Sequence, residues 1–349
     1  MAGSGTAHLR PADDTLLRVE HLVVEFPAGG GKKVHAVSDV SLDIAPGETL
    51  GLVGESGCGK STTGRAVLQL PRPTSGSVRF DGTELTELKG EGMRRVRPQL
   101  QMIFQDPISS LNPRRRVADI VGEGLAIWKM GDDESRRKKV DEVLEAVGLD
   151  PAAAGRRRPH EFSGGQCQRI SIARAVVTEP KLIICDEPVS ALDVSVQAQI
   201  LNLLEDMKSR YGLTLVFIAH DLAVVKNVSD RVAVMYLGKI CEVGPPDEIY
   251  AAPAHPYTAA LLLAIPVPDP DLRPEERPVV GGEIPSPLDP PSGCRFRSRC
   301  PRAQERCAQE EPIIREIRPK HYVACHFPLD QGETLVHEMS TNGETATTS

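Results

Sequence analysis

One segment constrains the fold of this chain more than any other part of its sequence. Residues 54–62 read Gly-Glu-Ser-Gly-Cys-Gly-Lys-Ser-Thr, which fits the phosphate-binding loop pattern of spaced glycines followed by Lys and Ser or Thr. Residues 49–53 read as a short buried strand that enters the loop, and residues 62–70 read as a helix that leaves it. Strand, glycine loop and helix are the order that this anion-binding device requires.

Each residue type in the loop has a chemical reason. The glycines let backbone N–H groups curl around an anion, because no Cβ is in the way. Lys60 adds a positive charge for the outer phosphates, and Ser61 offers a hydroxyl to Mg²⁺. The helix adds the positive end of its dipole. The predicted triphosphate-binding residues are Gly54, Glu55, Ser56, Gly57, Cys58, Gly59, Lys60, Ser61 and Thr62.

Composition and charge exclude some classes of protein. The 349 residues are enough for one large domain or two ordinary ones, and the net charge of -7 argues against a nucleic-acid binder held by a global basic field. The most apolar run near the C-terminal part, residues 257–265, is much shorter than the ~20 residues needed to cross a bilayer. We therefore expect a cytosolic protein, unless a partner places it at a membrane.

The order of segments predicts the domain organisation. Residues 1–15 read as a flexible tail, and residues 16–250 read as an α/β domain whose apolar strands between helices indicate a parallel sheet. Residues 251–329 are rich in proline and then in cysteine, and residues 330–349 read as a disordered tail.

Polar residues follow three further strands of the predicted sheet. Asp186 ends the apolar strand at residues 182–185, where its carboxylate can hold the Mg²⁺ shell, and Glu187 is a candidate to orient or deprotonate the attacking water. His220 follows the strand at residues 214–219 and could sense the terminal phosphate. Gln105 follows residues 102–104 in the same way.

A second anion-binding pattern lies before the helix predicted at residues 170–178. Ser-Gly-Gly-Gln opens this helix, and a helix N-terminus is favourable for an anion. Two such devices on one chain favour two chains packed head to tail, so that each nucleotide contacts both. The residues of the second pattern are Ser163, Gly164, Gly165 and Gln166.

Together these motifs resemble the ATPase subunit of ATP-binding cassette (ABC) transporters. Residues 54–62 resemble the Walker A motif, residues 182–187 the Walker B motif, residues 163–166 the signature, Gln105 the Q-loop and His220 the switch histidine. The resemblance implies ATP as the nucleotide and Mg²⁺ held by Ser61, Gln105 and Asp186. It implies adenine stacking on Phe26, with Glu187 and His220 as catalytic residues, and a D-loop with Asp193 that acts with the signature on the ATP of a second chain.

The resemblance also implies the architecture. The expected fold is the α/β P-loop NTPase cassette, with a RecA-like parallel sheet core, N-terminal antiparallel strands, a helical subdomain at about residues 106–178 and a small Cys-rich C-terminal extension.

A narrower resemblance points to the group of oligopeptide and dipeptide importers. It rests on residues 104–107, 110–114 and 255–258, and on a chain that extends beyond the cassette. It implies a second ATPase subunit, identical or different, two transmembrane permease subunits and an extracytoplasmic peptide-binding protein. It implies a peripheral place on the cytoplasmic face of the membrane. Nickel importers share these features, so nickel stays open as the substrate.

Four of the eight cysteines gather near the C-terminus at Cys294, Cys300, Cys307 and Cys325. Four thiolates in one segment can hold Zn²⁺ or a [4Fe–4S] cluster, and free thiols are the remaining alternative. Interleaved arginines would lower the thiol pKa values. The arrangement resembles one that some peptide-importer ATPases use for an iron–sulfur cluster, so a [4Fe–4S] cluster is expected, with Zn²⁺ as the alternative.

Two other functions compete with import. A soluble ABC ATPase that acts on nucleic acid or the ribosome is opposed by the acidic net charge and by the importer-like motifs, and no nucleic-acid partner is expected. A regulatory cassette without hydrolysis would lose nothing on Glu187→Gln, whereas we expect that substitution to stop turnover.

Overall fold

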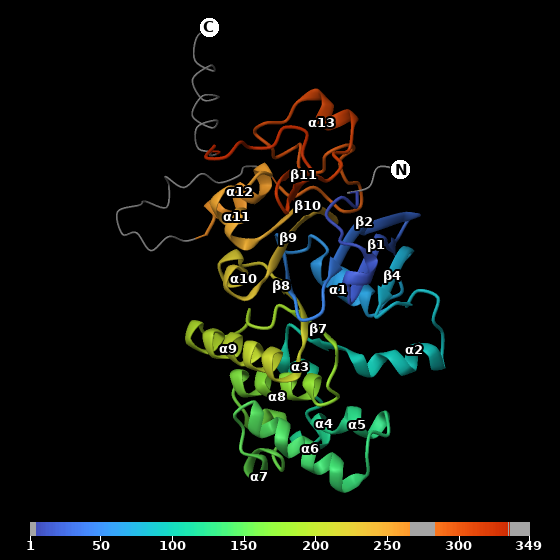
Figure 1. Cartoon of the computed structure of the whole chain (residues 1–349), viewed down its shortest axis with the longest axis vertical. Coiled ribbons are helices and arrows are strands. Elements are labelled where there is room, and N and C mark those ends of the chain that lie inside the picture. Colours follow the sequence, from blue (N-terminus) through green and yellow to red (C-terminus); the bar gives the residue numbers. More distant parts are fainter. Residues whose placement is uncertain (1–4, 266–282, 334, 336–349) are drawn as a thin grey trace. The chain divides into compact units, whose positions relative to one another are not determined.

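A computed structural model describes residues 5–265, 283–333 and 335 (Figure 1). The predicted disordered tail at 330–349 lies largely outside these residues, as do residues 1–4 of the predicted N-terminal tail. The chain divides into two compact units. Unit 1 comprises Met1–Ile44, Leu50–Thr86 and His220–Ser349, and unit 2 comprises Ala45–Thr49 and Glu87–Ala219.

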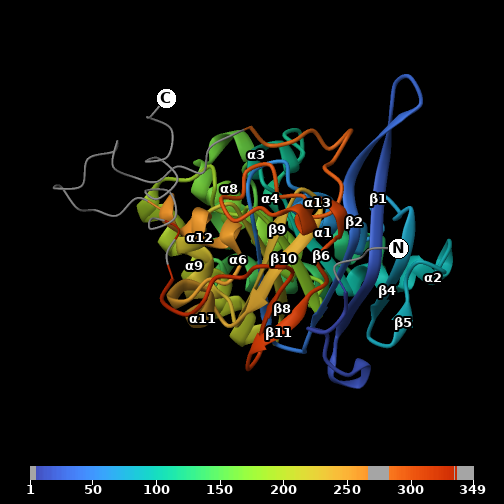
Figure 2. The same ribbon diagram turned by 90° about the horizontal axis from the view of Figure 1, so that it is seen from above.

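Unit 1 contains an antiparallel sheet with the strand order β2-β1-β4-β5. Its two long strands, β1 and β2, run side by side (Figure 2), and alternate residues of β1 such as Leu17 and Val19 are fully buried. This alternation is typical of a sheet with one face on the core. The strands are β1 (Leu17–Ala28), β2 (Lys32–Ile44), β4 (Ser75–Phe80) and β5 (Thr83–Glu84).

A second group of unit 1 strands has the order β11-β12-β10-β9-β3. Only β3 and β9 are parallel, and all residues of β3 are buried. The strands are β3 (Thr49–Val53), β9 (Arg231–Tyr236), β10 (Lys239–Gly244), β11 (Arg315–Arg318) and β12 (His321–Val323). The helices of unit 1 are α1 (Lys60–Val67), α10 (Leu222–Val228), α11 (Pro246–Ala251), α12 (Pro256–Leu263), α13 (Glu305–Gln309) and the 3₁₀ helix η1 (Ala12–Asp14).

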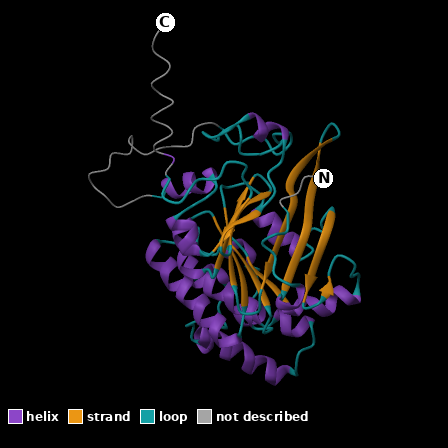
Figure 3. Cartoon of the chain, turned by 45° about the horizontal axis from the view of Figure 1, so that its top comes forward, coloured by secondary structure: helices purple, strands orange, loops and turns teal. Residues whose placement is uncertain are grey.

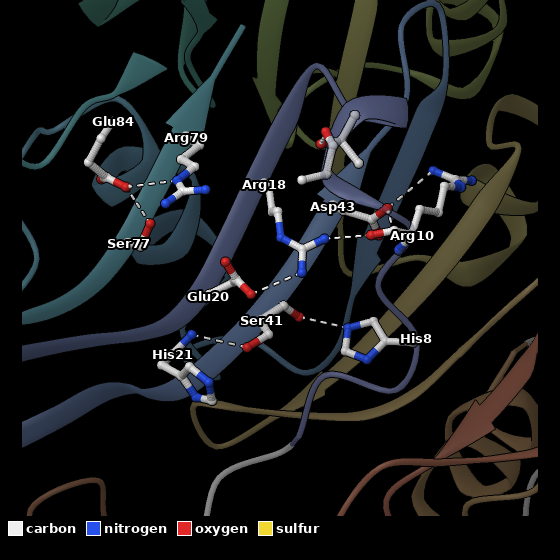
Figure 4. A network of polar contacts seen from close by, with 12 residues as sticks. His8, Arg10, Arg18, Glu20, His21, Ser41, Asp43, Ser77, Arg79 and Glu84 are labelled. Carbon is white, nitrogen blue, oxygen red and sulfur yellow. Dashed lines mark hydrogen bonds and ion pairs between the residues drawn. The ribbon is translucent and has the colours of Figure 1, made fainter. Parts of the chain in front are cut away.

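Part of the segment predicted as a flexible N-terminal tail makes defined contacts with β2 (Figure 4). His8 is buried, and its Nε2 lies 2.9 Å from the backbone oxygen of Ser41. The backbone N–H of Arg10 donates to the buried carboxylate of Asp43 at 3.2 Å. The sequence did not indicate this anchoring because the partners lie 33 residues away along the chain.

Unit 2 contains three parallel strands, β6, β7 and β8, in which Leu100 pairs with Leu182 and Leu182 with Thr214. Every residue of β7 and β8 is buried, as expected for strands covered on both faces. The strands are β6 (Leu100–Ile103), β7 (Leu182–Asp186) and β8 (Thr214–Ala219).

Helices make up most of the remainder of unit 2 (Figure 3). Eight of the 13 residues of α8 are buried, because this helix packs against α3, α4, α6 and α9. The helices are α2 (Glu91–Val96), α3 (Pro107–Ser110), α4 (Val117–Val121), α5 (Glu123–Ile127), α6 (Asp133–Ala146), α7 (Pro151–Ala154), α8 (Gly164–Val176), α9 (Val194–Tyr211) and the 3₁₀ helices η2 (Arg97–Gln99) and η3 (Pro159–Glu161).

The helix after the glycine loop starts earlier and ends earlier than the predicted 62–70. It starts at Lys60, because the backbone oxygen of Gly59 accepts from both the N–H and the hydroxyl of Thr63, at 2.8 and 3.0 Å. It ends at Val67, shortly before Gln69 adopts a left-handed conformation with φ +59°. Such a conformation does not continue an α-helix.

The C-terminal extension belongs to the same unit as the glycine loop and is not set apart at residue 251. The reason is strand pairing: β12 pairs antiparallel with β10, with Glu242 opposite Val323. Two strands from beyond residue 300 therefore extend the group that contains β3.

Within the described ranges, no helix combines the length and the apolar character needed to span a membrane.

Candidate functional site

The glycine loop lies between β3 and α1 in unit 1, and close contacts with neighbouring backbone explain two of its glycines. A Cβ on Gly54 would lie 2.1 Å from the backbone oxygen of Met235, and one on Gly59 would lie 2.3 Å from that of Ala36. Both glycines also have positive φ, +152° and +105°. Only glycine fits these positions, so the loop holds a shape that exposes backbone N–H groups.

Lys60 lies inside this loop. Its side chain is buried, and the ammonium donates to the backbone oxygens of Gly54 at 2.7 Å and Glu55 at 3.0 Å. Cys58 is also buried, with Sγ 3.9 Å from the Lys60 ammonium, and burial raises its pKa. The Lys60 ammonium can exchange these backbone oxygens for phosphate oxygens when an anion enters the loop.

The outer residues of the loop are open to solvent. Ser56 and Gly57 are exposed, whereas Ser61 and Thr62, in the first turn of α1, are half-buried. Phe26 on β1 keeps 37% of its surface exposed, and His220 is exposed just before α10. These predicted site residues all belong to unit 1.

Unit 2 holds the two predicted carboxylates. Asp186 is fully buried at the end of β7, and Glu187 follows with a left-handed φ of +47°. The N–H of Glu187 donates to the backbone oxygen of Ile218 at 3.0 Å. A non-glycine residue at positive φ costs of order 1–3 kcal/mol, and such strain concentrates at functional sites.

Gln105 contacts Glu187 directly. Its Nε2 donates to the Glu187 carboxylate at 3.0 Å, although the two residues are 82 positions apart. The structure thus brings together two residues that the sequence had placed only at the ends of separate strands. This bond from the amide helps to fix the direction of the Glu187 carboxylate.

The predicted signature residues begin α8. Ser163 is the N-cap: its hydroxyl accepts from the N–H of Gln166 at 3.3 Å, while the Gln166 side chain accepts from the N–H of Ser163 at 3.0 Å. This reciprocal capping box orders the start of α8 through contacts between neighbouring residues. Ser163 and Gln166 are exposed, Gly164 and Gly165 are half-buried, and the Arg157 guanidinium lies 4.3 Å from the centre of the Phe162 ring.

The predicted D-loop residue Asp193 is exposed at the N-terminus of α9. The next residue, Val194, has 82% of its surface exposed, which is unusual for a branched apolar side chain at the start of a helix. A Cβ on Gly165 would lie 2.7 Å from the Val196 side chain, so α8 and α9 approach closely near both motifs.

The expected [4Fe–4S] cluster, and its Zn²⁺ alternative, are not supported. Across the described ranges, no group of three or more His, Cys, Asp or Glu side chains is arranged to hold a metal ion, and none of the eight cysteines forms a disulfide. Burial raises the pKa of Cys294, and it raises the pKa of Cys325 to about 12. The remaining two expected ligands, Cys300 and Cys307, are half-buried and buried.

The interleaved arginines, which were expected to lower the thiol pKa values, form bonds with carboxylates and backbone oxygens. Arg299 pairs with Glu55, and Arg302 pairs with Glu333 at 2.7 Å. The others follow the same pattern: Arg295 donates to the backbone oxygen of Leu237, Arg297 to that of Ser292, and Arg306 pairs with Glu310.

Sequence reasoning missed two residues that contact the glycine loop. Tyr257 on α12 accepts from the N–H of Glu55 at 2.8 Å, and Arg299 pairs with the Glu55 carboxylate through two bonds of 2.8 and 3.0 Å. These partners are 202 and 244 residues from Glu55 along the chain. No spacing rule connects residues at such distances, so the sequence carried no signal for either contact.

Comparison with known families adds two matches on this one chain. The profile of the family described as "ABC transporter" matches residues 37–190, and that described as "Oligopeptide/dipeptide transporter, C-terminal region" matches residues 241–307.

Two curated relatives match almost end to end. A protein of Bacillus subtilis, described as a putative oligopeptide transport ATP-binding protein, is 52% identical over 89% of this chain and 95% of its own length. The oligopeptide transport ATP-binding protein OppF of Escherichia coli is 52% identical over the same shares of the two chains.

Two solved structures share the fold. CbiO1 of Clostridium perfringens, described as part of an ABC transporter complex, matches with a TM-score of 0.61 and 31% identity over 68% of this chain and 91% of its own. A dimeric ATP-binding cassette, MJ0796, solved with ADP and phosphate in a post-hydrolysis state, matches with a TM-score of 0.60 and 28% identity over 66% and 98%. The chain belongs to the ABC transporter family, in the group of oligopeptide transport ATP-binding proteins.

Proposed function

We propose that this chain is the ATP-hydrolysing subunit of an importer of oligopeptides or dipeptides. The observation that carries the proposal is the end-to-end similarity, 52% over 89% of the chain, to proteins described as oligopeptide transport ATP-binding proteins. The match of residues 241–307 to the oligopeptide/dipeptide transporter C-terminal region adds support from a segment outside the residues that match the ABC transporter model.

In this proposal the glycine loop binds the triphosphate of ATP. Lys60 turns its ammonium from the oxygens of Gly54 and Glu55 toward the outer phosphates, and the N–H groups at the start of α1 bind the phosphate oxygens. Phe26, whose ring is partly exposed, stacks on the adenine. Gly57, Ser56 and Thr62 complete the loop around the nucleotide.

Oxygen ligands for Mg²⁺ come from Ser61, Gln105 and Asp186. These donors fit a hard cation, because Mg²⁺ prefers oxygen ligands, and Asp186 offers a carboxylate at the end of β7. Bound Mg²⁺ neutralises charge on the outer phosphates.

Glu187 orients the attacking water and accepts its proton. The bond from the Gln105 amide and the strained backbone hold this carboxylate in one direction before ATP arrives. His220 contacts the terminal phosphate and stabilises the charge that develops there. In this assignment Gln105 is a metal ligand and also donates a hydrogen bond to the Glu187 carboxylate.

The second half of the ATP site comes from another chain. Ser163 and Gln166 are exposed at the N-terminus of α8, and Asp193 is exposed at the start of α9. Their N–H groups and side chains bind the ATP held by the glycine loop of a second ATPase subunit, which is identical or different. The dimeric state of the similar cassette MJ0796 supports this arrangement.

Transport needs further partners. We propose two transmembrane permease subunits that hold this chain at the cytoplasmic face of the membrane, and an extracytoplasmic peptide-binding protein that delivers the substrate. On unit 2, Ile108 keeps 58% of its surface exposed, close to Gln105, and offers an apolar contact for a permease.

The test is ATP hydrolysis by the complex reconstituted with its permease and binding protein, with short peptides or nickel as the added substrate. Stimulation by peptides and not by nickel is the expected result. Stimulation by nickel alone, or by no peptide of any length, would overturn the proposed substrate.

A further inference from the structure

Glu55 of the glycine loop is held from three directions. Its backbone oxygen accepts from Lys60, its N–H donates to the Tyr257 hydroxyl, and its carboxylate pairs with Arg299. The first contact lies within the loop. The other two come from the C-terminal region, by which we mean residues 256–265 and 283–333.

The pair between Arg299 and Glu55 has the geometry of a strong one. Both guanidinium Nη atoms bind the carboxylate, at 2.8 and 3.0 Å, and the Arg299 side chain is only 8% exposed. Bidentate, charge-assisted bonds of this kind are about twice as strong as neutral ones. Pairing with Glu55 also raises the pKa of Arg299.

A buried aromatic cluster fixes the direction of Arg299. Its guanidinium carbon lies 5.8 Å from the centre of the Tyr236 ring and 5.9 Å from that of Phe296. Tyr257 packs against both rings, with centres 4.7 and 5.4 Å apart, and all three rings are 1% exposed. The two residues that hold Glu55 are therefore parts of one rigid cluster.

The same segment supports the loop at a second point. Arg295 donates to the backbone oxygen of Leu237, and the N–H of the next residue, Gly238, donates to the backbone oxygen of Cys58 at 2.8 Å. The C-terminal region thus contacts the loop directly at Glu55 and through one turn at Cys58.

The negative charge of Glu55 explains why these contacts affect nucleotide binding. A carboxylate on the loop that binds a triphosphate repels it, and the repulsion grows as the surroundings become less polar. Arg299 neutralises that carboxylate through its two bonds.

We infer that the C-terminal region sets the ATP affinity of the glycine loop, with Arg299 and Tyr257 as positioning residues that act through Glu55. The inference rests on the proposed function only in that ATP binds this loop. It assigns to the region that distinguishes this group of ATPases a role in nucleotide binding.

The inference predicts an ordered set of ATP affinities. Arg299→Gln leaves the Glu55 carboxylate unpaired beside the phosphates, so the Kd for ATP rises about tenfold, which corresponds to ~1.4 kcal/mol. Glu55→Gln removes the repulsion, so the double substitution Glu55→Gln with Arg299→Gln returns the Kd to within about threefold of the original. Tyr257→Phe, which removes only the acceptor of the Glu55 N–H, raises the Kd about threefold.

The experiment titrates the full chain with a fluorescent ATP analogue and measures kcat and KM for ATP in the reconstituted complex. Arg306→Gln on α13 is the matched control, because Arg306 is exposed and its ion pair is with the nearby Glu310, four residues further along the chain. Positioning raises KM together with Kd and leaves kcat within about twofold, whereas general damage to the fold lowers kcat and the melting temperature.

Restored affinity in the double variant supports the inference. An unchanged Kd in Arg299→Gln, or a double variant as weak as Arg299→Gln, overturns it. If Arg299→Gln does not fold, Tyr257→Phe decides: an unchanged Kd there contradicts the inference. Failure of the unsubstituted chain to bind ATP would overturn the proposed function instead, so the two failures are distinguishable.

Discussion

The glycine loop at residues 54–59 and the segment at Ser163–Gln166 both bring glycines to the start of a helix, yet the chain holds them in opposite ways. The first is enclosed by backbone from Ala36 and Met235 and is held at Glu55 by residues 202 and 244 positions away. The second is fixed by a capping box within four neighbouring residues, and its polar side chains are exposed.

The difference suits two separate functions, anion binding in the first loop and contact with another chain in the second. A loop that must keep its shape around a multiply charged anion gains from long-range contacts, because they resist the movement that the charge would cause. A loop that is presented to another chain gains from local contacts, because these leave its outer surface free. Three properties can be tested separately: the hydrolysis step at Glu187, the uncharged His255 beside the first loop, and the exposed side chains of the second loop.

The largest effect is expected from Glu187→Gln. Without a base that accepts the proton of the attacking water, turnover in the reconstituted complex falls about 1000-fold, while the Kd for ATP is unchanged. Steady-state ATPase assays and nucleotide titration measure the two quantities. The exposed carboxylate Glu205 on α9 provides the matched control, Glu205→Gln. Full activity in Glu187→Gln would point to a regulatory cassette.

The second-largest effect is expected from acid, which should destabilise α12, the helix whose Tyr257 contacts the glycine loop. His255 caps α12 by accepting from the N–H of Tyr257, and burial lowers its pKa to about 4. Because the unfolded state takes up the proton near its ordinary pKa, stability falls as pH drops from about 7 to about 5, by about 2 kcal/mol from this residue.

Asn at position 255 keeps an acceptor for the cap without the titration. Chemical denaturation of His255→Asn at both pH values should therefore show a smaller loss on acidification than the unsubstituted chain. Equal losses in the two proteins would exclude His255 as the source.

Ser163→Ala is expected to lower turnover about tenfold, because it removes the cap that orders its loop and the hydroxyl that we propose to contact the ATP of a second chain. The Kd for ATP on a dilute single chain should not change. Ser209→Ala, at the exposed end of α9, is the control. A weaker Kd in Ser163→Ala would mean that this loop belongs to the ATP site of its own chain.

The smallest effect is expected from Arg157→Ala. Its guanidinium packs on the Phe162 ring just before Ser163, and exposed contacts of this kind contribute roughly 0.5–1 kcal/mol. Turnover should fall about threefold, with Arg156→Ala, on the same exposed loop, as the control. If both substitutions lower turnover equally, the contact between Arg157 and Phe162 is excluded as the explanation.

The elements that follow local rules were predictable from the sequence. The strand at residues 214–219 has the predicted bounds, because its apolar run starts after Thr214 and ends before the polar His220. The capping box at Ser163 and the strand, loop and helix order around Lys60 also follow from neighbouring residues. The parts of the ATP site that depend on neighbouring residues could therefore be predicted from the sequence.

Long-range pairings were not predictable. The arginines between the C-terminal cysteines were expected to lower thiol pKa values, but Arg299 pairs with Glu55, and burial raises the pKa of Cys325 to about 12. The bond between Gln105 and Glu187 likewise joins residues from separate strands. Which partner a charged side chain chooses depends on tertiary packing, and no spacing in the sequence records it.

The most direct test of this comparison is one titration of dilute full-length chain with a fluorescent ATP analogue, carried out on the unsubstituted protein, Arg299→Gln and Ser163→Ala. The account predicts that Arg299→Gln binds about tenfold more weakly and that Ser163→Ala binds like the unsubstituted protein. Equal weakening in both variants, or weakening in Ser163→Ala alone, would contradict it.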